Sequence, residues 1–579
     1  MSLKFRLPAL ALAAALGACS TLPRPAPSSI APFAEAPETT GVAAHAMVAA
    51  ANPMAVEAGL AVLRRGGSAA DAAVAVQAVL GLVEPQSSGL GGGAFMVYYD
   101  AKTRQVTAYD GRETAPAGAA PDMFLGPDGK PLPPIVNILS GRSTGAPGAV
   151  AMLDLAQRAH GRLPWASLFA DAERLAEQGF PVPKRLAAAA NSQAAQAQTP
   201  DAAAYFTKPD GSRVREGDTF RNPAYAQSLR RIARERSAGL LKGPIAKAIV
   251  RRVHEGERPG ALSLSDLAAY RPKSAPALCR PYRIYLVCLP PAPAGGPSVL
   301  EALGLLERTD IAARDPVDPQ AWSLFAQASR LTYADRDRYM GDPAFVTVPT
   351  DGLLSAAYLD ARARLIGPVA GPPPEPGLPP GAPTRGADRA LEPGGTSHLV
   401  IVDAFGDVVS MTTTVESVFG SGRMAAGFFL NNQLTDFSAS PRGPDGAPAA
   451  NAVAPGKRPR SAMSPTIVLD RQGRFVAALG SPGGPGIIAY NLKALVGLLD
   501  WKLSPQAAID LPNLIARGAL YDAEVAKMPP AVTQGLAERG IRLVTGTGAE
   551  GSGLHVIAAV PGGYRGGADK RRDGVARGF

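Results

Sequence analysis

The sequence Leu391-Glu392-Pro393-Gly394-Gly395-Thr396-Ser397-His398 ends a long segment rich in proline and glycine. Residues 399–402, which follow it, are all apolar, and after a short turn a second run with many β-branched residues covers 408–414. Two such runs on either side of a glycine-containing turn are typical of a β-hairpin. Thr396 is therefore expected where a flexible segment enters a core strand.

The position of Thr396 allows its hydroxyl to attack the carbonyl carbon of Gly395. The glycines before it permit backbone angles that other residues resist. If this peptide bond breaks, Thr396 carries both a nucleophile and a base, the α-amine that the cleavage creates. The local pattern taken alone favours a plain linker that runs into a strand, because short motifs often occur by chance.

The composition is that of a globular protein, with 46% apolar and 19% charged residues in 579, a length that allows several domains. The formal charge of +10 falls to +8 without Lys4 and Arg6 and is spread along the chain. No nucleic-acid-binding motif accompanies it, so no nucleic-acid partner is predicted. The five histidines show no ligand spacing, and neither a metal nor another cofactor is expected.

The first eighteen residues have a basic start and a mostly apolar stretch that is too short to span a membrane, which predicts a secretory leader. Leu16-Gly17-Ala18-Cys19 resembles the bacterial lipoprotein cleavage box, in which the cysteine becomes lipidated. Residues 19–40 are rich in proline, as suits a tether. We therefore expect a periplasmic protein anchored to the membrane by a lipid on Cys19. The alternative is an ordinary leader cut near Ala18, which leaves a soluble periplasmic protein.

The other two cysteines, Cys279 and Cys288, lie nine residues apart. An exported protein can join them in a disulfide. They can equally be two small buried residues that flank a strand.

Two short stretches suggest polar sites. Arg112 follows the predicted strand 106–110, where an arginine can bind a carboxylate through two parallel hydrogen bonds. A surface arginine paired with Glu113 or Asp110 is the alternative. Gly483 and Gly484 precede a predicted helix at 487–499, so their amides can form an oxyanion hole, although a plain tight turn also fits.

The remaining patterns set the framework. Asn52-Pro53 predicts the start of a helix that ends before Gly66-Gly67, and Ser68 begins another. The glycine-rich stretch 89–93 leads into a predicted strand, and close backbone packing explains it better than a nucleotide loop. Residues 147–270 and 298–338 are mostly helical, and 467–479 form a hairpin. The strips 367–395 and 438–451 are predicted to be mobile.

Together these stretches resemble the γ-glutamyltransferases (γ-glutamyltranspeptidases), members of the N-terminal-nucleophile (Ntn) hydrolase superfamily, from residue 41 to residue 579. The marks of the resemblance are several motifs in the family's order: residues 71–73, 91–93, 112–113, 396–398, 430–437, 457–466 and 480–484. The resemblance implies an α/β (α+β layered) fold, a four-layer αββα sandwich. It also implies one compact unit made when a precursor cuts itself before Thr396. The large chain would cover 41–395 and the small catalytic chain 396–579.

The resemblance also implies roles. Thr396 would be the nucleophile, and Thr414 would orient it. The residues that would bind a γ-glutamyl substrate or its transition state are Arg112 and Ser461 for the α-carboxylate, Asp436, Glu416 and Gln433 for the α-ammonium, and Gly483 and Gly484 for the oxyanion. Such an enzyme cleaves γ-glutamyl amides, with glutathione expected, through an ester on Thr396. Water or the amine of an amino acid or peptide then receives the acyl group.

Two departures from the family pattern keep alternatives open. Many members have two serines where this chain has Ser461-Ala462, and the loop 438–451 is shorter than usual and has no aromatic residue. A related acylase acting on β-lactam side chains is therefore the nearest alternative enzyme. An uncut, inactive lipoprotein that serves as a binding module is the alternative outside enzymes.

Overall fold

The computed structural model describes residues 1–2, 41–388, 390, 392, 394–546 and 551–579. The predicted leader beyond its first two residues, Cys19 and the tether lie outside the described residues. Within the described part, none of the helices combines the length and the apolar character that crossing a membrane requires.

The predicted hairpin at Thr396 lies at the centre of a seven-stranded sheet. β9 (Gly395–Val402) pairs antiparallel with β10 (Val408–Glu416), and all residues of both strands are buried. The strand order is β19-β1-β9-β10-β2-β3-β6. The other strands of this sheet are β1 (Met47–Ala50), β2 (Gly93–Asp100), β3 (Gln105–Gly111), β6 (Lys273–Pro276) and β19 (Val575–Gly578).

A second, six-stranded sheet has the order β18-β17-β14-β13-β8-β7. Its strands are β7 (Leu278–Tyr282), β8 (Tyr285–Leu289), β13 (Thr466–Asp470), β14 (Phe475–Gly480), β17 (His555–Val560) and β18 (Gly563–Ala568). The pair β13–β14 confirms the second predicted hairpin. Cys279 and Cys288 lie opposite each other on β7 and β8 and form a disulfide, which decides between the two alternatives for this pair.

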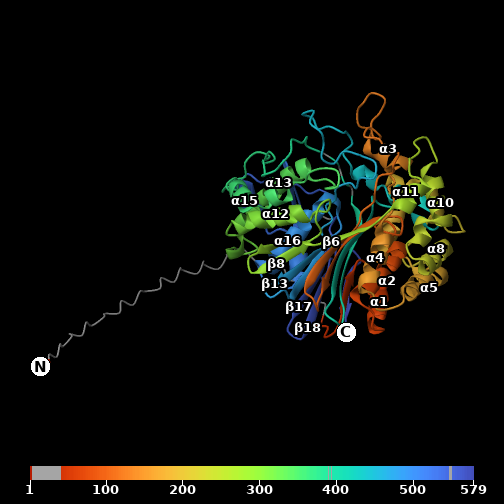
Figure 1. Cartoon of the computed structure of the whole chain (residues 1–579), viewed down its shortest axis with the longest axis horizontal. Helices are drawn as coiled ribbons and strands as arrows, with labels where there is room; N and C mark the ends of the chain where they lie inside the picture. Colours follow the sequence, from red (N-terminus) through yellow and green to blue (C-terminus); the bar gives the residue numbers. More distant parts are fainter. Residues whose placement is uncertain (3–40, 389, 391, 393, 547–550) are drawn as a thin grey trace.

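Helices cover the outer face of each sheet. The main helices against the seven-stranded sheet are α1 (Pro53–Arg64), α2 (Ala69–Val83) and α4 (Ala149–His160). Further out on the same side lie α5 (Ala170–Gln178), α8 (Pro223–Glu235) and α10 (Gly243–Val253) (Figure 1). Asn52 caps α1 and Ser68 forms a capping box with Asp71 on α2, as predicted. On the other side lie α12 (Gly296–Glu307), α13 (Pro319–Tyr339) and α16 (Ile487–Leu499).

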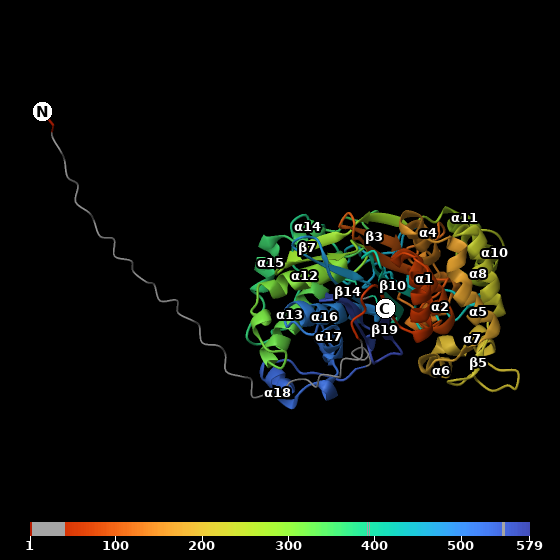
Figure 2. The ribbon, with the colours of Figure 1, turned by 90° about the horizontal axis from the view of Figure 1, so that it is seen from below.

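Three buried cores separate four layers (Figures 1 and 2). One core lies between each sheet and its helices. The third lies between the sheets, where Val400 and Val402 pack with Ile467 and Ala478. The alternation of β-strand side chains accounts for this arrangement, because successive residues of one strand enter different cores. The predicted αββα sandwich is confirmed.

The segment before β9 contains neither helix nor strand over its described residues 364–388, 390, 392 and 394. Hydrogen bonds nevertheless attach it to α13: Gly367 N donates to Gln327 Oε1 at 3.0 Å, and Gly377 N donates to Asp335 Oδ1 at 2.6 Å. The mobility expected for residues 367–395 stays a prediction.

Candidate active site

A chain of hydroxyl groups leads from Thr396 to the peptide bond that precedes it. Thr396 Oγ1 donates to Thr414 Oγ1 at 3.2 Å, and Thr414 Oγ1 donates to the carbonyl oxygen of Gly395 at 2.7 Å. The amide of Glu416 donates to Thr414 Oγ1 at 2.7 Å and fixes its orientation. Thr396 is only 4% exposed. The proton of the Thr396 hydroxyl therefore has a direct path toward the Gly395 carbonyl oxygen.

The register of the hairpin produces this geometry. Thr414 is the partner of Thr396, and an irregularity follows before Glu416, the partner of Gly395. A Cβ on Gly395 would lie 2.4 Å from the carbonyl oxygen of Ser417, so only glycine fits there. A Cβ on Gly92 would lie 1.9 Å from the carbonyl oxygen of Thr414, which confirms the close packing expected of that glycine turn.

A cavity of about 20 Å³ lies beside these hydroxyls and brings together most of the predicted site residues. The residues that line it extend in the chain from Arg112, just after β3, to Ile487, the first residue of α16. They are Arg112, Glu392, Thr396, Thr414, Glu416, Gln433, Asp436, Ser461, Ala462, Met463, Gly484 and Ile487. Of the predicted residues, Gly395 and Gly483 are absent from this lining and adjoin it in the chain.

Three acceptor oxygens of this lining stand out. Glu416 Oε1, Gln433 Oε1 and Asp436 Oδ1 are buried and accept no hydrogen bond from an N–H or hydroxyl group of the described residues. The carboxyl groups of Glu416 and Asp436 lie within hydrogen-bond reach of each other. The other oxygen of each carboxylate is held in place: Asp436 Oδ2 accepts from Gln433 Nε2 at 2.7 Å, and Glu416 Oε2 accepts from Ser417 Oγ at 2.6 Å. Three acceptor groups that line one small space and lack an N–H or hydroxyl donor suit an ammonium group, which donates three hydrogen bonds.

The electrostatics of the two carboxylates point the same way. Burial, and then the neighbouring charge of Asp436, raises the pKa of Glu416 well above its usual range. Burial also raises the pKa of Asp436, although Arg112 opposes this effect. Two buried acids that repel each other are stabilised in the charged form by an added cation.

Arg112 is buried, and the alternative of a surface arginine is wrong. It is 1% exposed, and its Nη2 donates to Asp436 Oδ2 and to the carbonyl oxygen of Arg460, each at 2.5 Å. Glu113 lies 4.0 Å away and is also buried. Arg112 therefore fixes one wall of the ammonium-sized space.

The glycine turn after β14 faces the segment that precedes Thr396. Gly483 has φ +130° and Gly484 has φ +56°, conformations that favour glycine. A Cβ on Gly394 would lie 3.4 Å from the amide nitrogen of Gly484, so this amide lies close to the peptide that would be cleaved. Tyr333 holds the turn from α13 by donating to the carbonyl oxygen of Pro485 at 2.5 Å.

A family model described as gamma-glutamyltranspeptidase matches residues 55–579. The chain belongs to the gamma-glutamyltranspeptidase family. The resemblance and the enzyme class predicted from the sequence are thereby confirmed. The glutathione hydrolase proenzyme of Bacillus subtilis (strain 168) is 35% identical over 546 residues, which are 92% of this chain and 91% of that protein. The acylase ACY 1 proenzyme of Pseudomonas sp. (strain V22) is 32% identical over 539 residues, 91% of this chain and 92% of that protein.

Solved structures agree with this family. Cephalosporin acylase from Bacillus halodurans superposes with a TM-score of 0.81 at 27% identity, over 97% of this chain and 98% of that one. Helicobacter pylori gamma-glutamyltranspeptidase gives a TM-score of 0.53 at 30% identity, over 58% of this chain and 94% of that one.

This gamma-glutamyltranspeptidase-family chain has site residues that sequence reasoning missed. Glu392 lies in the cavity lining, and its carboxylate accepts from Arg336 at 2.6 Å and from Arg460 at 2.8 Å. Burial raises the pKa of Glu392, but the two arginines outweigh it and lower the pKa to about 2. Arg572 Nη1 donates to the carbonyl oxygen of Thr396 at 2.8 Å. Arg460 stands inside the motif 457–466 and Glu392 only four residues before Thr396, whereas no local signal marks Arg572.

Proposed function

We propose that this chain cuts itself between Gly395 and Thr396 and then transfers γ-glutamyl groups from γ-glutamyl amides to water or to an amine. The observation that carries the proposal is the set of buried acceptors beside the Thr396 hydroxyl, Glu416 Oε1, Gln433 Oε1 and Asp436 Oδ1, which no N–H or hydroxyl group of the described residues satisfies. They provide a site for the α-ammonium that distinguishes a γ-glutamyl group from a plain acyl group. Arg112 and Ser461 would bind its α-carboxylate.

Self-cleavage uses the hydroxyl chain. Thr396 Oγ attacks the carbonyl carbon of Gly395 while its proton passes through Thr414 toward the carbonyl oxygen. The C–N bond then breaks, the nitrogen of Thr396 takes a proton, and an ester joins Gly395 to Thr396. Water hydrolyses this ester and leaves a carboxylate on Gly395 together with a free hydroxyl and a free amine on Thr396.

Turnover repeats this chemistry on the substrate. The α-amine of Thr396 takes the hydroxyl proton, and the oxygen attacks the γ-carbonyl, whose oxyanion the amides of Gly483 and Gly484 would bind. The amine returns the proton to the leaving nitrogen, and water or an acceptor amine resolves the γ-glutamyl ester. An α-amine has an unperturbed pKa of about 7.7–8.0 and can act as this base near neutral pH. Glutathione is the expected donor, because relatives are named glutathione hydrolases.

The experiment compares two chromogenic amides, a γ-glutamyl anilide and a glutaryl anilide that lacks the α-amine. We expect purified protein to show two bands on a denaturing gel, a small chain that begins at Thr396, and faster release from the γ-glutamyl compound. E416Q should reduce the ratio of the γ-glutamyl rate to the glutaryl rate, because it raises KM for the γ-glutamyl anilide and leaves KM for the glutaryl anilide unchanged. One unbroken band, as an inactive binding module requires, or a small chain with another first residue would refute the proposal.

Acylase activity is the second candidate, and a large cavity favours it. A space of about 720 Å³ is lined in part by Thr435 and Phe437, the chain neighbours of Asp436. Its lining is largely apolar, with Phe124, Leu132 and Ile138 among the contributors. Bulky apolar leaving groups would fit there. Faster release from the glutaryl compound would establish this candidate instead and remove the role given to Asp436.

We also propose that the protein is an exported lipoprotein. The disulfide between Cys279 and Cys288 suits an oxidising compartment. Cells grown with labelled palmitate should incorporate it into the wild type and not into C19A, and C19A should move from the membrane to the soluble fraction. Equal labelling of the two proteins would refute the anchor.

A further inference from the structure

The last loop of the chain reaches the nucleophile from the side that β1 leaves open. β1 pairs with β9 from Leu399 to Val402 only, so the start of β9 extends past the end of β1. The loop 569–574 joins β18 of one sheet to β19 of the other at this place. From it, Arg572 Nη1 reaches the carbonyl oxygen of Thr396 at 2.8 Å.

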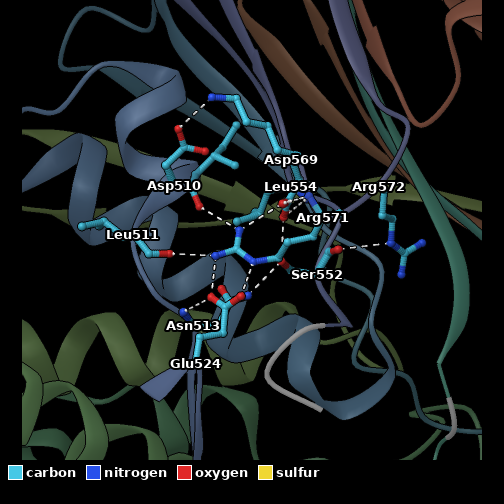
Figure 3. A network of polar contacts seen from close by, with 12 residues as sticks. Asp510, Leu511, Asn513, Glu524, Ser552, Leu554, Asp569, Arg571 and Arg572 are labelled. Atoms are coloured by element: carbon cyan, nitrogen blue, oxygen red, sulfur yellow. Dashed lines mark hydrogen bonds and ion pairs between the residues drawn. The ribbon is translucent and has the colours of Figure 1, made fainter. Parts of the chain in front are cut away.

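Arg572 is placed there by the residues around it. Its Nε donates to the carbonyl oxygen of Ser552 at 3.1 Å, and its Nη2 donates to that of Gly551 at 2.8 Å. Figure 3 shows Arg572 on one side of Ser552 and the cluster around Arg571 on the other. These two hydrogen bonds orient the guanidinium toward Thr396. Their acceptors are neutral carbonyl oxygens, so they do not cancel the positive charge of Arg572.

The neighbouring Arg571, and not Arg572, forms the ion pair with Asp569. Arg571 Nη1 donates to Asp569 Oδ1 at 3.0 Å, and the other oxygen of Asp569 accepts from Ser552 Oγ at 2.6 Å. Arg571 also forms an ion pair with Glu524 at 2.5 Å (Figure 3). The two adjacent arginines therefore have different partners. Arg571 binds carboxylates as well as carbonyl oxygens, whereas the hydrogen bonds of Arg572 within the described residues end on carbonyl oxygens, including that of Thr396.

Resting on the proposed function, we propose that Arg572 is a positioning residue whose guanidinium holds the backbone of Thr396 and favours the neutral form of the amine that cleavage creates. The nitrogen and the carbonyl oxygen of one residue lie about 3 Å apart by covalent geometry. A cation bound to that oxygen is therefore within about 6 Å of the amine, and a like charge at this distance disfavours an ammonium ion.

Other charged and titratable groups surround Thr396 on every side. They are Glu416 on β10, Asp436 and Arg112 across the cavity, Glu392 in the preceding segment, Glu84 after α2 with its partner Arg185, His398 on β9, Tyr490 on α16, and Asp569 beside Arg571. Glu84 is paired with Arg185 at 3.0 Å, and burial lowers the pKa of His398 well below its usual range, which keeps it neutral. Asp436 and Glu416 act in the opposite direction, and the substrate ammonium would compensate them. Arg112 and Arg185 pair with carboxylates, whereas Arg572 binds the backbone of Thr396 itself and opposes protonation of the amine there.

The test is the pH dependence of kcat/KM for a γ-glutamyl anilide in the wild type, R572K, R572Q and R571Q. The acidic limb of the plot of kcat/KM against pH reports the pKa of the catalytic base in the free enzyme. In R572Q we expect this limb to move to higher pH by about one pH unit, since the opposing charge is gone. R572K keeps the charge and should keep the limb, with a lower kcat because lysine lacks the planar fork.

R571Q is the matched control, because it removes the adjacent guanidinium. It should lower the melting temperature and leave the limb in place. A second measurement follows carbamylation of the α-amine of Thr396 by cyanate, which reacts with an amine only in its neutral form. The pH at which this rate is half-maximal should rise in R572Q and stay unchanged in R571Q.

A limb that stays at the wild-type pH in cleaved R572Q, or that moves equally in R571Q, would overturn the inference. Folded R572Q that remains uncut while R572K is cut would support it, because a cation is then needed at the Thr396 carbonyl. A wild type that is uncut or inactive would instead overturn the proposed function, so the two failures are distinguishable.

Discussion

At the scale of single residues, Thr414 carries the most specific chemistry outside Thr396. Its hydroxyl donates to the Gly395 carbonyl oxygen and accepts from Thr396 and from the amide of Glu416. T414V keeps the shape and removes these bonds, and we expect self-cleavage to slow by about 10²–10³-fold, the effect of removing one oxyanion donor. A time course on denaturing gels measures it. T414S is the control and should cut at nearly the wild-type rate. Equal rates for T414V and T414S would contradict the assignment.

Glu113 gives a prediction about stability. It is fully buried, and its carboxylate oxygens have no hydrogen-bond partner among the described residues. Burial raises its pKa to about 8, above the value of about 4.3 expected in the unfolded chain. The folded protein therefore keeps a proton on Glu113 that the unfolded chain releases, so the contribution of Glu113 to stability is full below pH 4.3 and is lost as the pH rises to 8.

The variant E113Q removes this titration. We expect the fall in unfolding free energy between pH 4.5 and pH 8, at most about 1.4 kcal/mol per pH unit, to flatten. Urea unfolding at several pH values measures it, in a T396A background so that one uncut chain unfolds. E113D keeps a carboxyl group and should retain the slope. Parallel curves for E113Q and its parent would refute the buried proton.

At the scale of elements, the turn between β14 and α16 depends on left-handed glycines. Gly484 has φ +56°, and Gly518, in the turn between β15 (Leu514–Arg517) and β16 (Leu520–Ala523), has φ +57° with open space around it. Alanine at either position carries a similar backbone cost of about 1–2 kcal/mol. We expect G484A to lower kcat by about 10²-fold because an oxyanion amide moves, and G518A to leave kcat unchanged. Steady-state kinetics on both variants would contradict this if kcat were the same.

The elements also show how far sequence reasoning extends. The hairpin at Thr396 and the helix starts at Asn52 and Ser68 could be predicted, because alternation and capping are written within a few neighbouring residues. The contact of Arg572 with Thr396 could not, since it joins positions 176 residues apart and depends on where β1 ends. The roles of the site residues came from family motifs and stay predictions until variants are measured.

At the scale of the whole molecule, the predicted cut divides the chain without dividing the fold. In the seven-stranded sheet, β1 lies between β19 and β9, and β10 pairs with β2, so strands from before the cut pair with strands from after it at three places. In the other sheet β8 pairs with β13, and the buried pair of Arg112 and Asp436 also joins the two chains. Separating them would expose the core between the sheets and unpaired strand edges on both fragments.

We therefore expect the chains 41–395 and 396–579 to elute together from a sizing column at the mass of the uncut protein. High salt should not separate them, because ladder hydrogen bonds and buried apolar contacts are screened far less than surface ion pairs. Denaturant should separate them, and T396A should give one band under all conditions. Elution of the two chains apart in native buffer would mean that the cut loosens the sheets, and the cavity beside Thr396 would then no longer describe the active enzyme.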